Sequence, residues 1–142
     1  MKIVRALAIA TLGFLGVGAV AGAVPLIMDP SGKWMGMPIS LLDHSPFHSF
    51  LIPGIILLLS NGLLSLAILV MAIRRSPHYG WWVVFQGCVL TGWITVEVIM
   101  MRTAVWPHYL YWAIGIVLIA LGLALTRESR TASKVRAEVS VQ

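Results

Sequence analysis

Charged residues are spaced so that four long stretches of the 142-residue chain contain none of them. An α-helix needs roughly 20 residues to cross about 30 Å of hydrocarbon, and every one of these stretches reaches that length. The stretches cover residues 6–28, 44–73, 76–96 and 103–126. The pattern therefore predicts an integral membrane protein rather than a secreted, cytosolic or disordered one.

The turn signals between the stretches predict an all-α fold, a transmembrane four-helix bundle in residues 1–126. The expected helices cover about residues 5–28, 47–73, 81–101 and 107–126. Ser45 and Pro46 suit the cap and first turn of the second helix, and Pro53–Gly54 is expected to kink it near its start. Residues 127–142 are polar and mixed in charge, so we expect a cytoplasmic tail that is a frayed helix or disordered.

The first helix has an alternative interpretation as a secretory signal peptide. Lys2 and Arg5 precede an apolar run with small residues near its end, which is the layout of such a signal. A cleavable signal has an apolar region of about 7–15 residues, whereas the uncharged run here spans residues 6–28. We therefore expect a retained membrane helix, the alternative being a mature chain that starts near Val24.

Five of the seven prolines fall between residues 25 and 53. Proline cannot donate a backbone hydrogen bond and is poorly tolerated within a helix, and residues 29–32 (Asp-Pro-Ser-Gly) form a strong turn sequence. The same segment contains Trp34 together with several methionines and leucines, which makes it too apolar for a freely solvated loop. We expect an ordered outer loop that lies over the bundle or in the headgroup layer.

Lysine and arginine residues distribute unevenly between the two sides of the predicted bundle. Eight lie on the side of the termini and of the second turn, and two, Lys33 and Arg102, lie on the other. Because cytoplasmic segments are enriched in these residues, we expect both termini in the cytoplasm and the protein in a bacterial inner membrane. The formal net charge of +5 is then a topology signal that needs no nucleic acid, and the cationic side is expected to contact anionic lipids.

The chain also contains six short segments of distinctive sequence. They are Asp29-Pro30-Ser31-Gly32, Ser45-Pro46-Phe47, Leu51-Ile52-Pro53-Gly54, Asn61-Gly62, Gly92-Trp93-Ile94 and the stretch from Gly115 to Gly122. In these segments the chain resembles a group of small four-span bacterial integral membrane proteins of uncharacterised function. The resemblance covers nearly the whole chain and implies a four-span architecture, but it implies no activity.

Glu97 is the only acidic residue inside a predicted span. An ionised carboxylate in lipid must be paired, hydrated or neutralised, which makes an intramembrane acid a candidate functional residue. Gln86 and Trp93 share its helix face, because offsets of seven and eleven residues are close to whole numbers of turns. Asn61 is expected at the same membrane depth as Trp93, where a hydrogen bond to its indole or to nearby backbone would hold the two helices together. A proton or substrate relay through these side chains is the alternative.

Gly18 and Gly22 form a GxxxG pair in the first predicted helix. Small residues at this spacing let a second helix backbone approach closely. We expect the pair to pack against the second or third helix of the same chain, and a homo-oligomer formed through this face is the alternative.

Candidate residues on the outer face carry carboxylate, imidazole and guanidinium groups. They are Asp29, Asp43, His44, His48 and Arg102. His108 and several methionines fall on the same side, and imidazole with thioether suits copper. Their spacing lacks a clustered motif, so we expect no metal and no cofactor. The single cysteine, Cys88, excludes an intramolecular disulfide and paired-thiol chemistry.

The sequence contains no nucleophile motif, phosphate loop or carboxylate pair in a helical span, so we do not expect an enzyme. We expect a non-enzymatic accessory or partner-binding membrane subunit. The alternative is a small oligomeric transporter or channel subunit with a polar path through Glu97, Gln86 and Asn61. These two hypotheses differ in whether the Glu97 face borders a wet cavity or a dry helix contact. A third hypothesis, an enzyme or metal protein, requires convergence of Asp29, Asp43, His44, His48 and Glu97.

Overall fold

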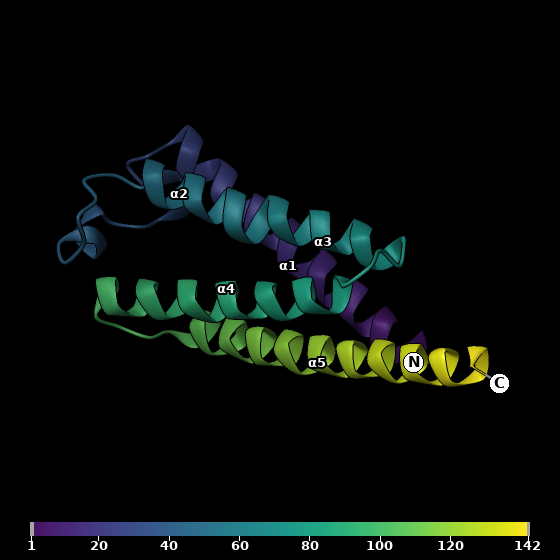
Figure 1. Ribbon diagram of the computed structural model, residues 1–142. Coiled ribbons are helices and arrows are strands. Elements are labelled where there is room, and N and C mark those ends of the chain that lie inside the picture. Colours follow the sequence, from purple (N-terminus) through teal and green to yellow (C-terminus); the bar gives the residue numbers. More distant parts are fainter. Residues whose placement is uncertain (1, 142) are drawn as a thin grey trace.

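The computed structural model describes residues 2–141, and the regular elements of the described chain are all helices, without a strand. In chain order the elements are α1 (Lys2–Met28), the 3-10 turns η1 (Lys33–Met35) and η2 (Ile39–Leu42), α2 (Leu51–Leu57), the π-helix η3 (Leu58–Leu63), α3 (Leu64–Ile73), α4 (Tyr79–Met101) and α5 (Trp106–Ser140). Figure 1 shows that α2, η3 and α3 run on as one helix. Four helices in the described range are therefore long and apolar enough to cross a membrane, which confirms the predicted all-α fold with four candidate spans.

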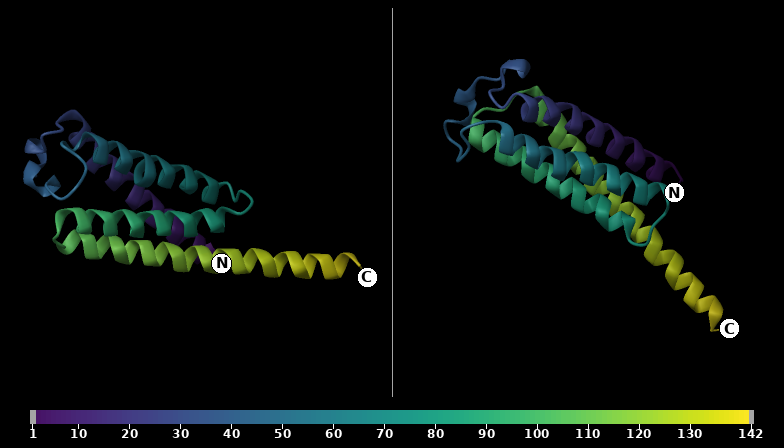
Figure 2. Two further views of the ribbon diagram at one scale, coloured as in Figure 1. Left: turned by 60° about the vertical axis from the view of Figure 1, so that its left-hand side comes forward. Right: turned by 90° about the horizontal axis from the view of Figure 1, so that it is seen from above.

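The four spans form two antiparallel pairs, α1 with the α2–α3 span and α4 with α5 (Figure 1). The pairs lie closest near the α3–α4 turn and separate toward the opposite end, which carries residues 29–50 (Figure 2). We call these two ends the turn end and the loop end. The largest buried cluster joins the pairs and includes Leu12, Ile68 and Leu118, whereas the loop end has only a small cluster around Phe50.

Helices α4 and α5 pack through glycines that lie opposite one another. A Cβ atom placed at Gly87 would lie 2.6 Å from the carbonyl oxygen of Gly115, and one at Gly122 would lie 2.6 Å from the backbone nitrogen of Val84. Without hydrophobic driving force between helices in lipid, such close backbone approach supplies the van der Waals contact that holds a pair together. The α4–α5 pair therefore depends on positions where no side chain fits.

The GxxxG pair of α1 makes looser contacts. A Cβ atom at Gly18 would lie 3.4 Å from the Tyr111 hydroxyl oxygen, and one at Gly22 would lie 3.8 Å from a Leu57 methyl carbon, which are ordinary contact distances. The close approach on α1 is made instead by Gly16, where a Cβ atom would lie 2.7 Å from Leu66. The tightest glycine of this helix therefore lies outside the predicted pair.

Two predicted helix starts are displaced by three or four residues in the structure. The first helix already begins at Lys2, and the second begins at Leu51 rather than Phe47, because the backbone N–H of Phe50 donates to the Pro30 carbonyl oxygen at 2.9 Å and holds the preceding segment in the loop. Pro53 then falls in the first helical turn, where its missing N–H needs no acceptor, so it produces no kink. The irregularity of this span is the π-helix η3 instead.

The last helix does not end near Thr126 but continues to Ser140, so the predicted helix end is wrong and the expected tail is helical in the described residues. Residues 127–140 contain neither glycine nor proline and are rich in Ala, Arg, Lys and Glu, which are good helix formers. Figure 2 shows this segment projecting beyond the other helices. Its residues are all exposed.

Candidate functional site

Gln86 of α4 joins the two helix pairs by hydrogen bonds at mid-span. Its side chain is fully buried, and its Nε2 donates to the Ser60 carbonyl oxygen at 3.1 Å and to Asn61 Oδ1 at 3.3 Å. Asn61 Nδ2 donates in turn to the Ser60 hydroxyl at 3.0 Å. Asn61 therefore takes part in an interhelical hydrogen bond as predicted, but its partner is Gln86 and not the Trp93 indole.

The π-helix η3 provides the acceptors for this contact. A π-turn carries one residue more than an α-turn, so its carbonyl groups leave the regular α-helical pattern. Ser60 and Asn61 lie inside η3 and present a carbonyl oxygen and an amide oxygen to α4. Asn61 thus lies inside the second span as expected, but nothing in the sequence predicted the π-helix.

A cavity of about 200 Å³ lies between the two helix pairs, bordered by α1, the α2–η3 segment, α4 and α5. Its lining contains Asn61, Trp93, Glu97, His108 and Tyr111, with apolar residues and glycines around them. The polar face predicted from the sequence is thus divided. Gln86 lies in a dry helix contact, whereas Trp93 and Glu97 border an open space.

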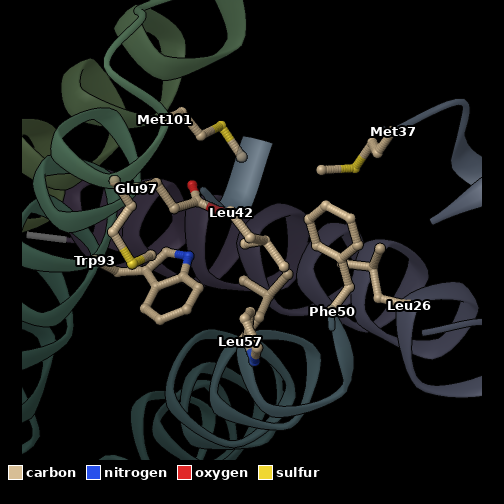
Figure 3. A pocket seen from close by; sticks show the side chains of 10 residues that line it. Leu26, Met37, Leu42, Phe50, Leu57, Trp93, Glu97 and Met101 are labelled. Carbon is tan, nitrogen blue, oxygen red and sulfur yellow. The ribbon is translucent and has the colours of Figure 1, made fainter. Parts of the chain in front are cut away.

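Glu97 and Trp93 also line a second, smaller cavity of about 30 Å³. Figure 3 shows this cavity, covered on the side of the loop by Met37, Leu42 and Phe50. Trp93 and Glu97 therefore line both the small cavity beneath the loop and the larger cavity deeper in the molecule.

Within the described chain, the polar atoms of Trp93 and Glu97 lack the hydrogen-bond or ion-pair partners that buried polar groups usually have. The buried indole nitrogen of Trp93 lies beside the Glu97 carboxylate but forms no hydrogen bond of normal geometry among residues 2–141 (Figure 3). No lysine, arginine or histidine within that range pairs with the carboxylate. Buried polar groups in native proteins are almost always satisfied, so this site is suited to receive a ligand, water or proton.

His108 and Tyr111 of α5 reach the cavity, although the sequence pattern did not group them with Glu97. His108 is buried, and its Nδ1 accepts a hydrogen bond from the Val105 N–H at 3.0 Å, which leaves the proton of the neutral ring on Nε2. The offset of three residues places both side chains on one face of α5. That spacing was readable from the sequence, but nothing in it indicates which face of α5 meets α4.

The candidate residues of the predicted outer face do not converge. Asp43, His44, His48 and Arg102 are exposed, and none of them lines either cavity. Within residues 2–141 no three His, Cys, Asp or Glu side chains are grouped so that they could hold a metal ion. The convergence with Asp29 and Glu97 that an enzyme or metal site would require is therefore wrong for these residues.

Asp29 has a structural role in the loop. Its carboxylate accepts hydrogen bonds from the Ser31 hydroxyl at 2.6 Å, from the Ser31 N–H at 3.3 Å and from the Trp34 N–H at 2.9 Å. The Ser31 hydroxyl, followed by the Trp34 N–H, lowers the pKa of Asp29 below its usual value. The carboxylate thereby fixes the turn that leads from α1 into the loop.

This lowered pKa predicts that the turn opens only in acid. Because the folded-state pKa lies below the unfolded one, the stabilisation is complete above the unfolded pKa of about 3.9 and is lost as pH falls through the folded value. We expect the amide proton shift of Trp34, followed by NMR, to stay constant from neutral pH to about pH 5 and to move below about pH 4. Asp29→Asn should abolish this titration and Asp43→Asn should leave it unchanged; a titration that persists without Asp29 would contradict the assignment.

The chain matches no protein-family model, no curated protein and no solved structure. Its similarity to small four-span bacterial membrane proteins stays a prediction. The geometry of the Glu97 cavity is therefore the basis of the functional proposal.

Proposed function

We propose that this chain is a non-enzymatic multi-pass membrane protein of the small transporter or channel-subunit type, which binds a small organic cation beside Glu97. The observation that carries the proposal is a carboxylate that lines a cavity of about 200 Å³ within the spans and has no cationic partner among residues 2–141. The sequence alone favoured an accessory subunit. The open space at Trp93 and Glu97 favours the alternative.

A positive charge on the ligand is the simplest compensation for Glu97. An ionised carboxylate inside a membrane is costly unless a cation, water or a proton accompanies it. Trp93 and Tyr111 line the same cavity, and aromatic faces attract quaternary ammonium groups. The cavity exceeds the roughly 150 Å³ that accommodates a benzene-sized molecule. We therefore expect a ligand that has a few heavy atoms more than benzene.

The distribution of cations supports an outward orientation of the loop end. Lys2, Arg5, Arg74 and Arg75 lie at the turn end, together with the basic residues of the α5 extension. By the positive-inside rule this end belongs in the cytoplasm of a bacterial cell, with both termini on that side of the inner membrane. The ligand would then enter beneath the residue 29–50 loop from outside.

Choline and its uncharged isostere 3,3-dimethylbutan-1-ol provide a direct test. We expect the purified chain in lipid nanodiscs to bind choline in calorimetric titrations at least about tenfold more tightly than the alcohol, which corresponds to about 1.4 kcal/mol. Glu97→Gln should remove this preference because it removes the counter-charge and keeps the shape. Asp43→Asn, which neutralises an exposed carboxylate of the loop, is the matched control and should retain the preference.

Two results would contradict the proposal. Equal binding of choline and the alcohol would show that Glu97 does not select charge, and an equal loss in the Asp43 variant would show only diffuse attraction. Transport is tested separately, by uptake of labelled choline into proteoliposomes that contain either the native chain or the Glu97→Gln variant.

The accessory-subunit function keeps one specific observation in its favour. Residues 127–140 project from the other helices as an exposed, mixed-charge helix that includes the exposed side chains of Val135 and Val139. A stable heteromer after mild detergent extraction that is lost on truncation after Thr126 would support this function. A symmetric oligomer of this chain alone would favour the transporter instead.

A further inference from the structure

A third cavity, with a polar lining, lies at the turn end, far along the helices from Glu97. It has a volume of about 230 Å³ and is lined by Lys2, Arg5, Arg75, Tyr79 and Glu128. These residues come from α1, the α3–α4 turn, α4 and α5, so all parts of the turn end contribute. We call this cavity the basic pocket.

The basic pocket has an excess of positive charge. Lys2, Arg5 and Arg75 supply three cations against the single carboxylate of Glu128, and the Tyr79 hydroxyl adds a neutral donor. Arginine presents several N–H donors in a planar fork, which matches the oxygen atoms of a phosphate group better than any single point charge does. The donor set is therefore suited to a phosphate anion.

The turn holds Arg75 in a backbone conformation that few residues adopt. Its φ is +53°, and His78 in the same turn has a φ of +63°, both in the left-handed region that favours glycine. The turn is closed by a hydrogen bond from the Ser76 N–H to the Met71 carbonyl oxygen at 3.0 Å. Strained non-glycine residues of this kind concentrate at binding sites, and here one of them places an arginine at the pocket.

The position of the pocket along the helix axis matches that of lipid headgroups. Tyr79 is followed closely by Trp81 and Trp82, two exposed indoles at the start of the α4 span, and tryptophan is enriched at membrane interfaces. The Arg130 guanidinium lies 5.8 Å from the centre of the Trp81 ring, which adds a cation beside the same interface. A ligand in the pocket would therefore lie where the apolar spans end.

We infer that the basic pocket binds the phosphate group of an anionic phospholipid. The headgroup phosphate would accept hydrogen bonds from Arg5, Arg75 and Lys2, while the acyl chains extend along the exposed apolar faces of the helices. Basic pockets between spans on the cytoplasmic side are a recurrent way of binding anionic headgroups. This site is independent of the cavity at Glu97 and does not depend on the proposed cation binding.

Native mass spectrometry of the delipidated full chain tests this site. We expect dioleoylphosphatidylglycerol to bind at least about tenfold more tightly than dioleoylphosphatidylcholine, since only the former carries a net negative charge. The double substitution Arg5→Gln and Arg75→Gln should weaken binding of the anionic lipid about thirtyfold, which corresponds to about 2 kcal/mol. Arg127→Gln with Arg136→Gln removes the same charge from the exposed α5 extension and should change the affinity less than about twofold.

The possible results distinguish a lipid phosphate from inorganic phosphate, and binding in the pocket from general attraction between charges. Equal affinities for the two lipids, or an equal loss in the α5 control, would overturn the assignment. Inorganic phosphate that displaces the anionic lipid at low millimolar concentration would show that the pocket serves a free phosphate instead. If the double variant fails to insert, Arg75→Gln alone leaves α1 intact and should weaken lipid binding about fivefold.

Discussion

Replacing Gly87 by alanine is expected to destabilise the α4–α5 pair by about 3 kcal/mol, the upper end of the usual range for overpacking. A Cβ atom at this position would lie 2.6 Å from the Gly115 carbonyl oxygen and 2.9 Å from the Ile119 backbone nitrogen. Both neighbours are backbone atoms, which cannot rotate away as a flexible side chain can. The two helices must therefore move apart and lose contact along their whole interface.

Gly92 provides the matched control because it lies on the same helix, and a Cβ atom placed there would meet nothing within 4 Å among the described residues apart from its chain neighbours and the backbone of its own helix. Alanine is favoured over glycine in a helix by about 1 kcal/mol, so Gly92→Ala should leave stability unchanged or raise it slightly. Unfolding in detergent by an SDS titration, followed by circular dichroism, measures both variants. Equal stability of the two variants would contradict the close packing of α4 against α5.

The positions of the four spans could be predicted from charge spacing alone, because a charged residue is costly in lipid wherever it occurs. The ends of the helices were less predictable. Ser45 and Pro46 have the sequence of a helix start, and the Ser45 hydroxyl indeed accepts from the Phe47 N–H at 3.2 Å. The chain nevertheless stays in the loop until Leu51, since Phe50 is fixed against the loop by its bond to Pro30.

The interior of the second span shows a different limit of sequence reasoning. Residues 58–63 have an ordinary apolar pattern around Asn61 and Gly62, and no local signal requires a π-turn. In the fold the Ser60 carbonyl oxygen of this turn accepts a hydrogen bond from Gln86 of another helix. A contact between two helices cannot be read from either helix alone.

The candidate site could be predicted within α4 but not across helices. Helical spacing puts Trp93 and Glu97 on one face, and both line the same cavities. His108 and Tyr111 join them from α5 because the glycine contacts with α4 fix the rotation of that helix. The glycine contacts thus determine which α5 side chains line the cavity. A variant that separates α4 from α5 should therefore also lose choline binding.

Gln86→Ala is the second substitution for which we expect a large effect, a loss of about 2–4 kcal/mol of stability. The side chain is fully buried between the helix pairs, so truncation leaves a void and removes both hydrogen bonds to η3. Gln86→Leu keeps most of the volume and should cost less, about 1–2 kcal/mol. Its cost is reduced further because Gln86 Oε1 has no partner among residues 2–141, and leucine removes that unpaired acceptor.

A double-mutant cycle isolates the hydrogen bond from the packing. Combining Gln86→Leu with Asn61→Leu should give a coupling free energy of about 0.6–1.7 kcal/mol, between the mean and the maximum measured for interhelical hydrogen bonds in a membrane protein. Thr95→Val is the control, since it removes an exposed contact in which the Thr95 hydroxyl accepts from the Trp112 indole N–H at 3.1 Å. Zero coupling between Gln86 and Asn61 would show that shape alone joins the two pairs. A measurable coupling would show that the hydrogen bond itself contributes to holding the two pairs together.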